Sequence, residues 1–110
     1  TMSAIRYFEE DKIAIASVRR DMLEEAGARA DETEGFIDFV MGVVGVEVGA
    51  CVMEIEKNKF KISLRSKSAD VNAVAGVFGG GGHVLASGCQ VFGEYEEVVD
   101  RLVCAIKRFI

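Results

Sequence analysis

Four consecutive glycines, Gly79, Gly80, Gly81 and Gly82, stand directly before His83, the only histidine of the chain. Glycine inside ordered structure costs roughly 0.5–1 kcal/mol relative to alanine, because its backbone loses more freedom on folding. One glycine is enough to end a helix, so a helix end alone does not explain the other three glycines. A run without side chains lets backbone N–H groups approach a ligand oxygen closely. The run therefore predicts an anion-binding loop, and a helical turn over residues 83–86 would add further donors.

Hydrophobic alternation predicts two strand pairs before the glycines and a strand after them. Ala4–Phe8 and residues 12–18 flank a short acidic turn, and residues 46–56 and Lys59–Ser66 flank a Lys-Asn turn. A further strand is expected near residues 89–92.

Helical spacing and capping residues predict four helices between and after these strands. They cover residues 19–26, a segment begun by Asp31 and Glu34 in a capping-box pattern, residues 71–78 after Asp70, and a final helix from Glu94. The order predicts a single α/β domain over residues 1–110, with a mixed sheet of about five strands and helices on its faces. The apolar stripe expected on the final helix is Val98, Leu102, Ala105, Ile106 and Phe109.

Composition narrows the class of protein. The net charge of −5 argues against a general nucleic-acid coat, which needs a basic face. Three cysteines are an odd number, and Cys51 and Cys104 lie in apolar patterns, so buried free thiols and a cytoplasmic setting are expected. A single histidine and no CxxC pair predict no metal site. No apolar run has the length of a membrane span, and no signal peptide opens the sequence.

One strand gathers basic side chains. Along Lys59–Ser66 apolar and polar residues alternate, so the two sets lie on opposite faces of the strand. A charged strand face is usually only the solvated side. Here every charged residue of the polar set is basic, in a chain that is acidic elsewhere, which favours an anion bound there. The polar set is Lys59, Lys61, Ser63, Arg65 and Lys67.

These features indicate binding of a phosphate without the means to cleave it. His83 follows the glycines and would charge beside a phosphate, since an imidazole titrates near neutral pH. The sequence has no second histidine and no Asp/His cluster that could hold metals for water activation. No catalytic residue is therefore expected in this chain.

The glycine run belongs to a longer and more specific pattern. SLRSK at 63–67 and VN at 71–72 precede FGGGGHVLASGC at 78–89. This series resembles the DHH-associated C-terminal domain of DHH-family phosphoesterases, which include exopolyphosphatase-related proteins. Among them it is most similar to the bacterial oligoribonuclease/adenosine-bisphosphate phosphatases. The resemblance extends back through residues 34–37 and 45–48 and covers nearly the whole chain.

The resemblance implies a two-domain enzyme that hydrolyses short oligonucleotides or nucleotide phosphates. In that family the N-terminal DHH domain binds manganese and activates water, and the C-terminal domain holds the substrate. The substrate-binding residues implied here are Arg65, Gly79, Gly80, Gly81, Gly82 and His83, with Ser87 as a hydroxyl donor. The DHH domain is absent from this chain, so the cofactor and the catalytic step are expected in that partner domain.

Several alternatives stay open at the sequence level. The chain could be the RNA-binding domain appended to alanyl-tRNA synthetase, although that relative usually has arginine in place of His83. It could also be a stand-alone nucleotide-binding or dimerisation module. The spacing alone does not decide whether Lys61 or Arg65 reaches the phosphate. The apolar helix over residues 36–44 is a candidate homodimer surface.

Overall fold

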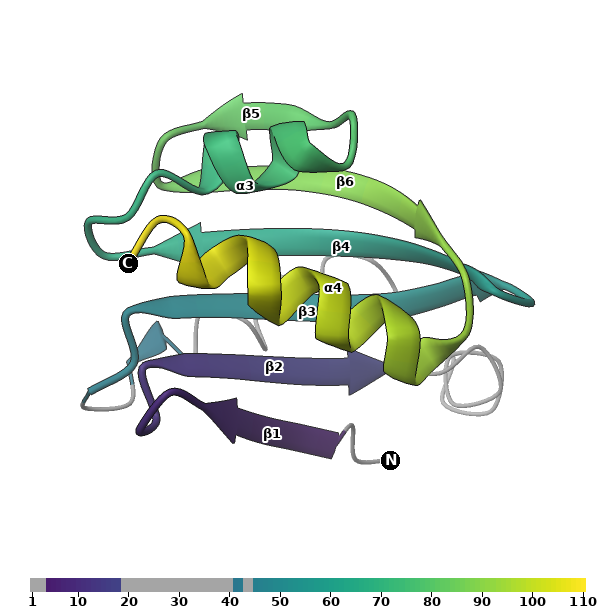
Figure 1. Ribbon diagram of the computed structural model, residues 1–110, viewed down its shortest axis with the longest axis horizontal. Coiled ribbons are helices and arrows are strands. Elements are labelled where there is room, and N and C mark those ends of the chain that lie inside the picture. Colours follow the sequence, from purple (N-terminus) through teal and green to yellow (C-terminus); the bar gives the residue numbers. More distant parts are fainter. Residues whose placement is uncertain (1–3, 19–40, 43–44) are drawn as a thin grey trace.

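The computed structural model describes residues 4–18, 41–42 and 45–110. The described part forms one α/β domain with a single mixed sheet, as the sequence predicts, and it includes two of the four expected helices (Figure 1). Two expected helices, over residues 19–26 and from Asp31, lie outside the described residues or almost entirely outside them. The same holds for the candidate dimer surface over residues 36–44. The elements are β1 (Ala4–Phe8), β2 (Ile13–Val18), β3 (Val48–Glu56), β4 (Lys59–Ser66), α3 (Val71–Val77), β5 (Gly81–His83), β6 (Ala86–Phe92) and α4 (Tyr95–Lys107).

The sheet is mixed and has the strand order β1-β2-β3-β4-β6-β5. The pair β2–β3 is parallel, and the other neighbouring pairs are antiparallel. About five strands were expected, and the sixth is β5, which the end of the glycine run forms with His83. The strand expected near 89–92 also begins earlier, at Ala86. The glycine run is therefore part of the sheet edge.

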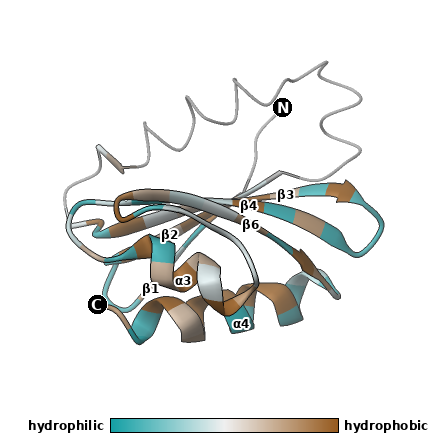
Figure 2. Cartoon of the chain, turned by 90° about the horizontal axis from the view of Figure 1, so that it is seen from above, coloured by the Kyte–Doolittle hydropathy of each residue, from teal (hydrophilic) through white to brown (hydrophobic). Residues whose placement is uncertain are grey.

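Both described helices cover the same face of the sheet (Figure 2). The inward residues of β2, β3, β4 and β6 meet the buried sides of α3 and α4 in one core. A large apolar side chain contributes roughly 1.5–3 kcal/mol when it is fully buried, so this layer supplies much of the stability. Fully buried side chains of this core include Ile13, Ile15, Ile62, Leu64, Leu102 and Ile106.

The two described helices begin where the sequence predicts. Asp70 is the N-cap of α3, and its carboxylate accepts a hydrogen bond from the Ala73 N–H at 3.0 Å. Glu94 is the N-cap of α4, whose predicted stripe is buried from Val98 to Ile106. Phe109 is the exception, because α4 ends at Lys107 and the Phe109 side chain is exposed. No described helix is long and apolar enough to cross a membrane.

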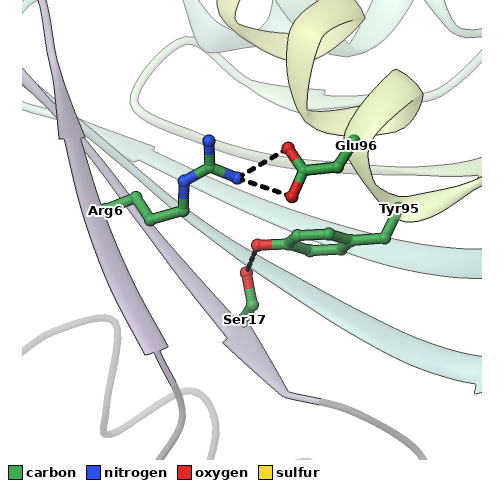
Figure 3. Close-up of polar contacts among 4 residues, drawn as sticks. All are labelled: Arg6, Ser17, Tyr95 and Glu96. Carbon is green, nitrogen blue, oxygen red and sulfur yellow. Dashed lines mark hydrogen bonds and ion pairs between the residues drawn. The ribbon is translucent and has the colours of Figure 1, made fainter.

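Two polar contacts fasten the start of α4 to the first two strands (Figure 3). Ser17 on β2 and Tyr95 on α4 share a hydrogen bond between their hydroxyl groups. Arg6 on β1 donates to both carboxylate oxygens of Glu96, at 3.0 and 3.3 Å, and this hydrogen bond raises the pKa of the guanidinium. The Tyr95 ring also packs near Phe60, with ring centroids 6.1 Å apart. Helix α4 is thus fixed to the sheet by more than apolar contact.

We expect Tyr95→Phe to destabilise the domain, because it leaves the buried Ser17 hydroxyl without its partner. The free energy of unfolding should fall by about 1–2 kcal/mol, measured by urea denaturation. Tyr7→Phe is the matched control, since Tyr7 is exposed on β1, and it should change stability by less than about 0.5 kcal/mol. Equal effects of the two substitutions would show that the Ser17–Tyr95 contact contributes nothing.

Candidate functional site

Gly79 ends helix α3, as the sequence predicts. Its φ of +83° is the left-handed conformation common directly after a helix C-cap, here Phe78. The Gly79 N–H donates to the Gly76 carbonyl at 3.1 Å, and the Gly80 N–H donates to the Ala75 carbonyl at 2.9 Å. These bonds satisfy carbonyls of the last turn of α3.

The following glycines lie against strand β6 at distances that no side chain fits. A Cβ added at Gly80 would lie 2.3 Å from the Gly88 carbonyl oxygen and 2.6 Å from the Cβ of Cys89. At Gly82, which has a φ of +154°, it would lie 2.8 Å from the Ala86 carbonyl oxygen. The expectation that these glycines have no structural role was therefore wrong, because Gly80 and Gly82 permit close backbone packing.

The helical turn expected over residues 83–86 is absent. Residues 84 and 85 are instead the two-residue turn of a hairpin that pairs His83 with Ala86. The turn is held from both sides, since the Ser66 N–H donates to the Leu85 carbonyl at 3.1 Å and the Val71 N–H donates to the Val84 carbonyl at 2.8 Å. The hairpin tip is consequently fixed to β4 and α3.

The glycine amides are largely used inside the domain. Besides those of Gly79 and Gly80, the Gly82 N–H donates to Asn72 Oδ1 at 2.9 Å. Amides alternate in direction along an antiparallel strand, so the Gly81 amide faces β6 when that of Gly82 faces Asn72. The segment thus does not present the row of free N–H donors that the sequence analysis expected. What it offers a ligand is a surface without side chains.

Asn72 is the supporting residue that the sequence analysis missed. It lies in the first turn of α3, and its carbonyl oxygen accepts the Gly82 N–H. The segment containing Asn72 entered the sequence pattern without a role. A polar residue near the start of a helix is usually solvated, so only the tertiary structure shows that it orients the glycine strand.

Arg65 and His83 lie in one row across three strands. Arg65 on β4 pairs with Ala86 on β6, and Ala86 pairs with His83 on β5. Residues paired across a sheet point to the same face, and two strand spacings put the two backbones about 10 Å apart. Leu64 packs in the core with the helices, so its neighbour Arg65 points to the opposite face. Ala86, which stands between them in the row, has only a methyl side chain.

The neighbouring row on this face is a floor almost without side chains. It consists of Ser63, Gly88 and Gly81, paired in that order. Lys61, two residues before Ser63, is exposed beyond this row. At the adjacent edge of β6 lies a depression of about 430 Å³. It is lined by Lys61, Phe78, Gly79, Gly80, Gly88, Cys89 and Gln90.

The two basic candidates therefore occupy different places. Lys61 lines the depression beside Gly79 and Gly80, whereas Arg65 lies in the row of His83. Arg65 is half-buried, and its guanidinium donates to the Leu64 carbonyl at 2.8 Å. Ser87 lies apart from both, buried on the helix-covered face, where its hydroxyl donates to the Val71 carbonyl at 2.6 Å.

The three cysteines form no disulfide, and only two of them are buried. Cys51 and Cys89 are buried, and burial raises the pKa of the Cys89 thiol to about 11. Cys104 on α4 is exposed, so the expectation that it is buried was wrong. The described residues contain no group of three or more His, Cys, Asp or Glu side chains that could hold a metal ion.

The described chain is thus a six-stranded mixed sheet that carries a GGGGH hairpin near a basic strand. Residues 10–110 match the DHHA1 domain, and the chain belongs to that family.

Three proteins illustrate what the chain is similar to in sequence or in structure. The chain is 29% identical over 83 residues to the bifunctional oligoribonuclease and PAP phosphatase NrnA of Bacillus subtilis, a match that covers 76% of this chain and 26% of NrnA. An exopolyphosphatase-related protein from Bacteroides fragilis superposes with a TM-score of 0.83 at 26% identity, covering 94% of this chain and 31% of that one. The pGpG-specific phosphodiesterase PggH of Vibrio cholerae gives a TM-score of 0.59 at 15% identity, covering 97% and 36%, and that likeness concerns the fold alone. The chain thus spans between 26% and 36% of these proteins.

The glycine packing predicts unequal effects of two neighbouring substitutions. Gly80→Ala should lower the free energy of unfolding by about 2 kcal/mol or more, because its Cβ would meet the β6 backbone. Gly81→Ala should cost less than about 1 kcal/mol, since its Cβ would meet only Asn72 Oδ1, at 3.3 Å. Urea denaturation measures both, and similar losses would mean that the close approach at Gly80 is unimportant.

The cysteines should differ in their rate of alkylation. Because the thiolate is the reactive form, a pKa near 11 leaves Cys89 almost unreactive at pH 8. Its rate should rise as the pH increases toward that value, whereas exposed Cys104 should react at once. Mass spectrometry after timed alkylation of unreduced protein measures this, with Cys104→Ser as the control that removes the fast phase. Rapid modification of Cys89 at pH 8, or a disulfide, would contradict the structure.

Proposed function

We propose that this domain binds the phosphorylated end of a short oligonucleotide or a nucleotide phosphate, and presents it to a DHH domain for hydrolysis. The observation that carries the proposal is the basic set Lys61, Arg65 and His83 around a glycine floor, in a chain whose net charge is −5. A patch of exclusively basic side chains does not improve the solubility of an acidic protein. Such a patch does attract a phosphate electrostatically.

Each group has a distinct part in the proposed binding. Arg65 offers a planar guanidinium that can bind two phosphate oxygens at once. His83 offers a ring N–H from the edge strand β5, two strands away from β4, and Lys61 offers a further positive charge from β4. The row of Gly81 and Gly88 lets the phosphate approach the sheet closely, since no Cβ projects from it.

Hydrolysis itself is assigned to the complete enzyme. The proposed cofactor is manganese held by the DHH domain, where it would activate the attacking water. The described residues of this chain include no group of side chains that could hold such a metal. The role of this chain is to bind and orient the substrate. Its free thiols suit the reducing cytoplasm, which is the proposed location.

The similarity to NrnA supports the substrate class. NrnA is named as an oligoribonuclease and a phosphatase of PAP, and both activities concern a short phosphorylated nucleotide. We extend that class to this chain, and we propose that the chain binds nucleic acid.

Titration of the chain with adenosine monophosphate, followed by amide chemical shifts, tests the proposal. We expect shifts at Gly81, His83 and Arg65 with a dissociation constant on the order of millimolar, because the site is half open to water. The affinity should fall as salt is added, since the contact is ionic.

Arg65→Ala should weaken binding about tenfold, equal to about 1.4 kcal/mol. Arg65→Lys should restore it only partly, because an ammonium keeps the charge but loses the planar fork. Arg108→Ala is the matched control, since Arg108 is an exposed arginine at the end of α4. The proposed site is wrong if the nucleotide changes the amide chemical shifts of α4 or β1 instead. It is also wrong if Arg65→Ala and Arg108→Ala change the affinity equally.

A further inference from the structure

The most exposed of the large apolar side chains in the described residues is Phe92, at the end of β6. Its side chain is 66% exposed, although the alternate residues Cys89 and Val91 are buried beneath the helices. Alternation along the strand puts Phe92 on the face that carries Gln90, away from the helices. An aromatic ring held in water at the end of a strand has no role in the core of this domain.

A lysine from the neighbouring strand lies over this ring. Lys59 is the in-register partner of Phe92, and its Nζ lies 5.7 Å from the ring centroid. Lys61 and Arg65 follow on the same face of β4, because they are two and six residues further along the strand. The side of β4, β6 and β5 that points away from α3 and α4 therefore carries basic side chains from Lys59 to Arg65, with an aromatic ring at one end and His83 at the other.

The length of this row fits several nucleotides. Six strand residues separate Lys59 from Arg65, which is about 20 Å at 3.3–3.4 Å per residue. A nucleic-acid strand carries one phosphate per 3.4 Å when its bases are stacked, and fewer per unit length when it is stretched. About three to six nucleotides would therefore extend from the His83 end to Phe92.

We propose that Phe92 and Lys59 form a second subsite, which stacks a base of a single-stranded oligonucleotide whose phosphorylated end is held at Arg65 and His83. This inference rests on the proposed function and specifies its substrate as an oligonucleotide of several residues. Phe92 supplies the π-face that any base can stack on, and Lys59 contacts the adjacent phosphate. Ser63 and Gln90 lie between the two ends and offer uncharged hydrogen bonds.

A single strand of nucleic acid fits this face better than a protein partner does. Repeating phosphates match a row of cations, and a flat base matches one isolated ring, whereas a protein interface needs a continuous apolar centre. Phe92 is flanked on this face by Lys59 and Gln90 rather than by other apolar groups.

The experiment measures how affinity depends on oligonucleotide length. The chain is titrated by calorimetry with adenosine monophosphate and with oligoadenylates of two, three, five and seven residues. We expect the dissociation constant to fall about tenfold or more between one and five residues, and then to stay nearly level. Phe92→Ala should remove this gain while it leaves binding of the mononucleotide unchanged.

Two further variants separate stacking from general effects. Phe92→Leu keeps apolar bulk but has no ring, so it should lose the length-dependent gain as Phe92→Ala does. Tyr7→Ala is the matched control, because Tyr7 is an exposed aromatic residue on β1, at the other edge of the sheet, and it should keep the full gain. Lys59→Gln should lower the salt dependence of binding for the five-residue oligonucleotide only.

The outcomes distinguish this inference from the proposed function. One outcome is that adenosine monophosphate changes the amide chemical shifts of His83 and Gly81 while the affinity does not grow with oligonucleotide length. In that case the second subsite is wrong and the first remains. The second subsite is also wrong if Phe92→Leu keeps the gain, or if Phe92→Ala weakens mononucleotide binding equally, as a residue used only for packing would. Absence of any response at His83 and Gly81 overturns the proposed function and this inference together.

Discussion

The close contact between Gly80 and strand β6 is the constraint on which the site depends. The β6 backbone lies so near that a Cβ at Gly80 would stand 2.3 Å from a carbonyl oxygen. This contact brings the chain from the end of α3 directly to the sheet edge, where Gly81–His83 become the sixth strand. Without it, His83 would belong to a loop, and its side chain would have no fixed relation to β4.

The two faces of the sheet carry different kinds of side chain, because successive residues of a strand point to opposite faces. On β4 the odd-numbered positions from Lys59 to Arg65 carry the cations, while Phe60, Ile62 and Leu64 pack under the helices. The core under the helices can therefore be mostly apolar while the charged side chains of β4 stay on its opposite side. Ser87 illustrates the division, since one residue from Ala86 it lies on the packed face and donates to the Val71 carbonyl.

Local patterns were sufficient for most of the fold. Strand β4 has the predicted bounds, Asp70 caps α3, and the stripe on α4 is buried as far as Ile106, because each signal depends on near neighbours in the sequence. The glycine segment was harder to predict, since its contacts with β6 and Asn72 join residues whose approach no local pattern encodes. The burial of Cys104 was wrongly predicted for a similar reason, because an apolar sequence pattern does not say which side of a helix other elements cover.

Register is what turns these elements into a site. Arg65, Ala86 and His83 share a row only because a two-residue turn sets the pairing of β5 with β6. A shift by one residue would move every β5 side chain to the other face, so that His83 would point toward the helices. The hydrogen bonds that hold the turn to Ser66 and Val71 oppose such a shift. The same contacts that stabilise the hairpin therefore keep the histidine in the row of Arg65, which is the arrangement that the proposed binding site requires.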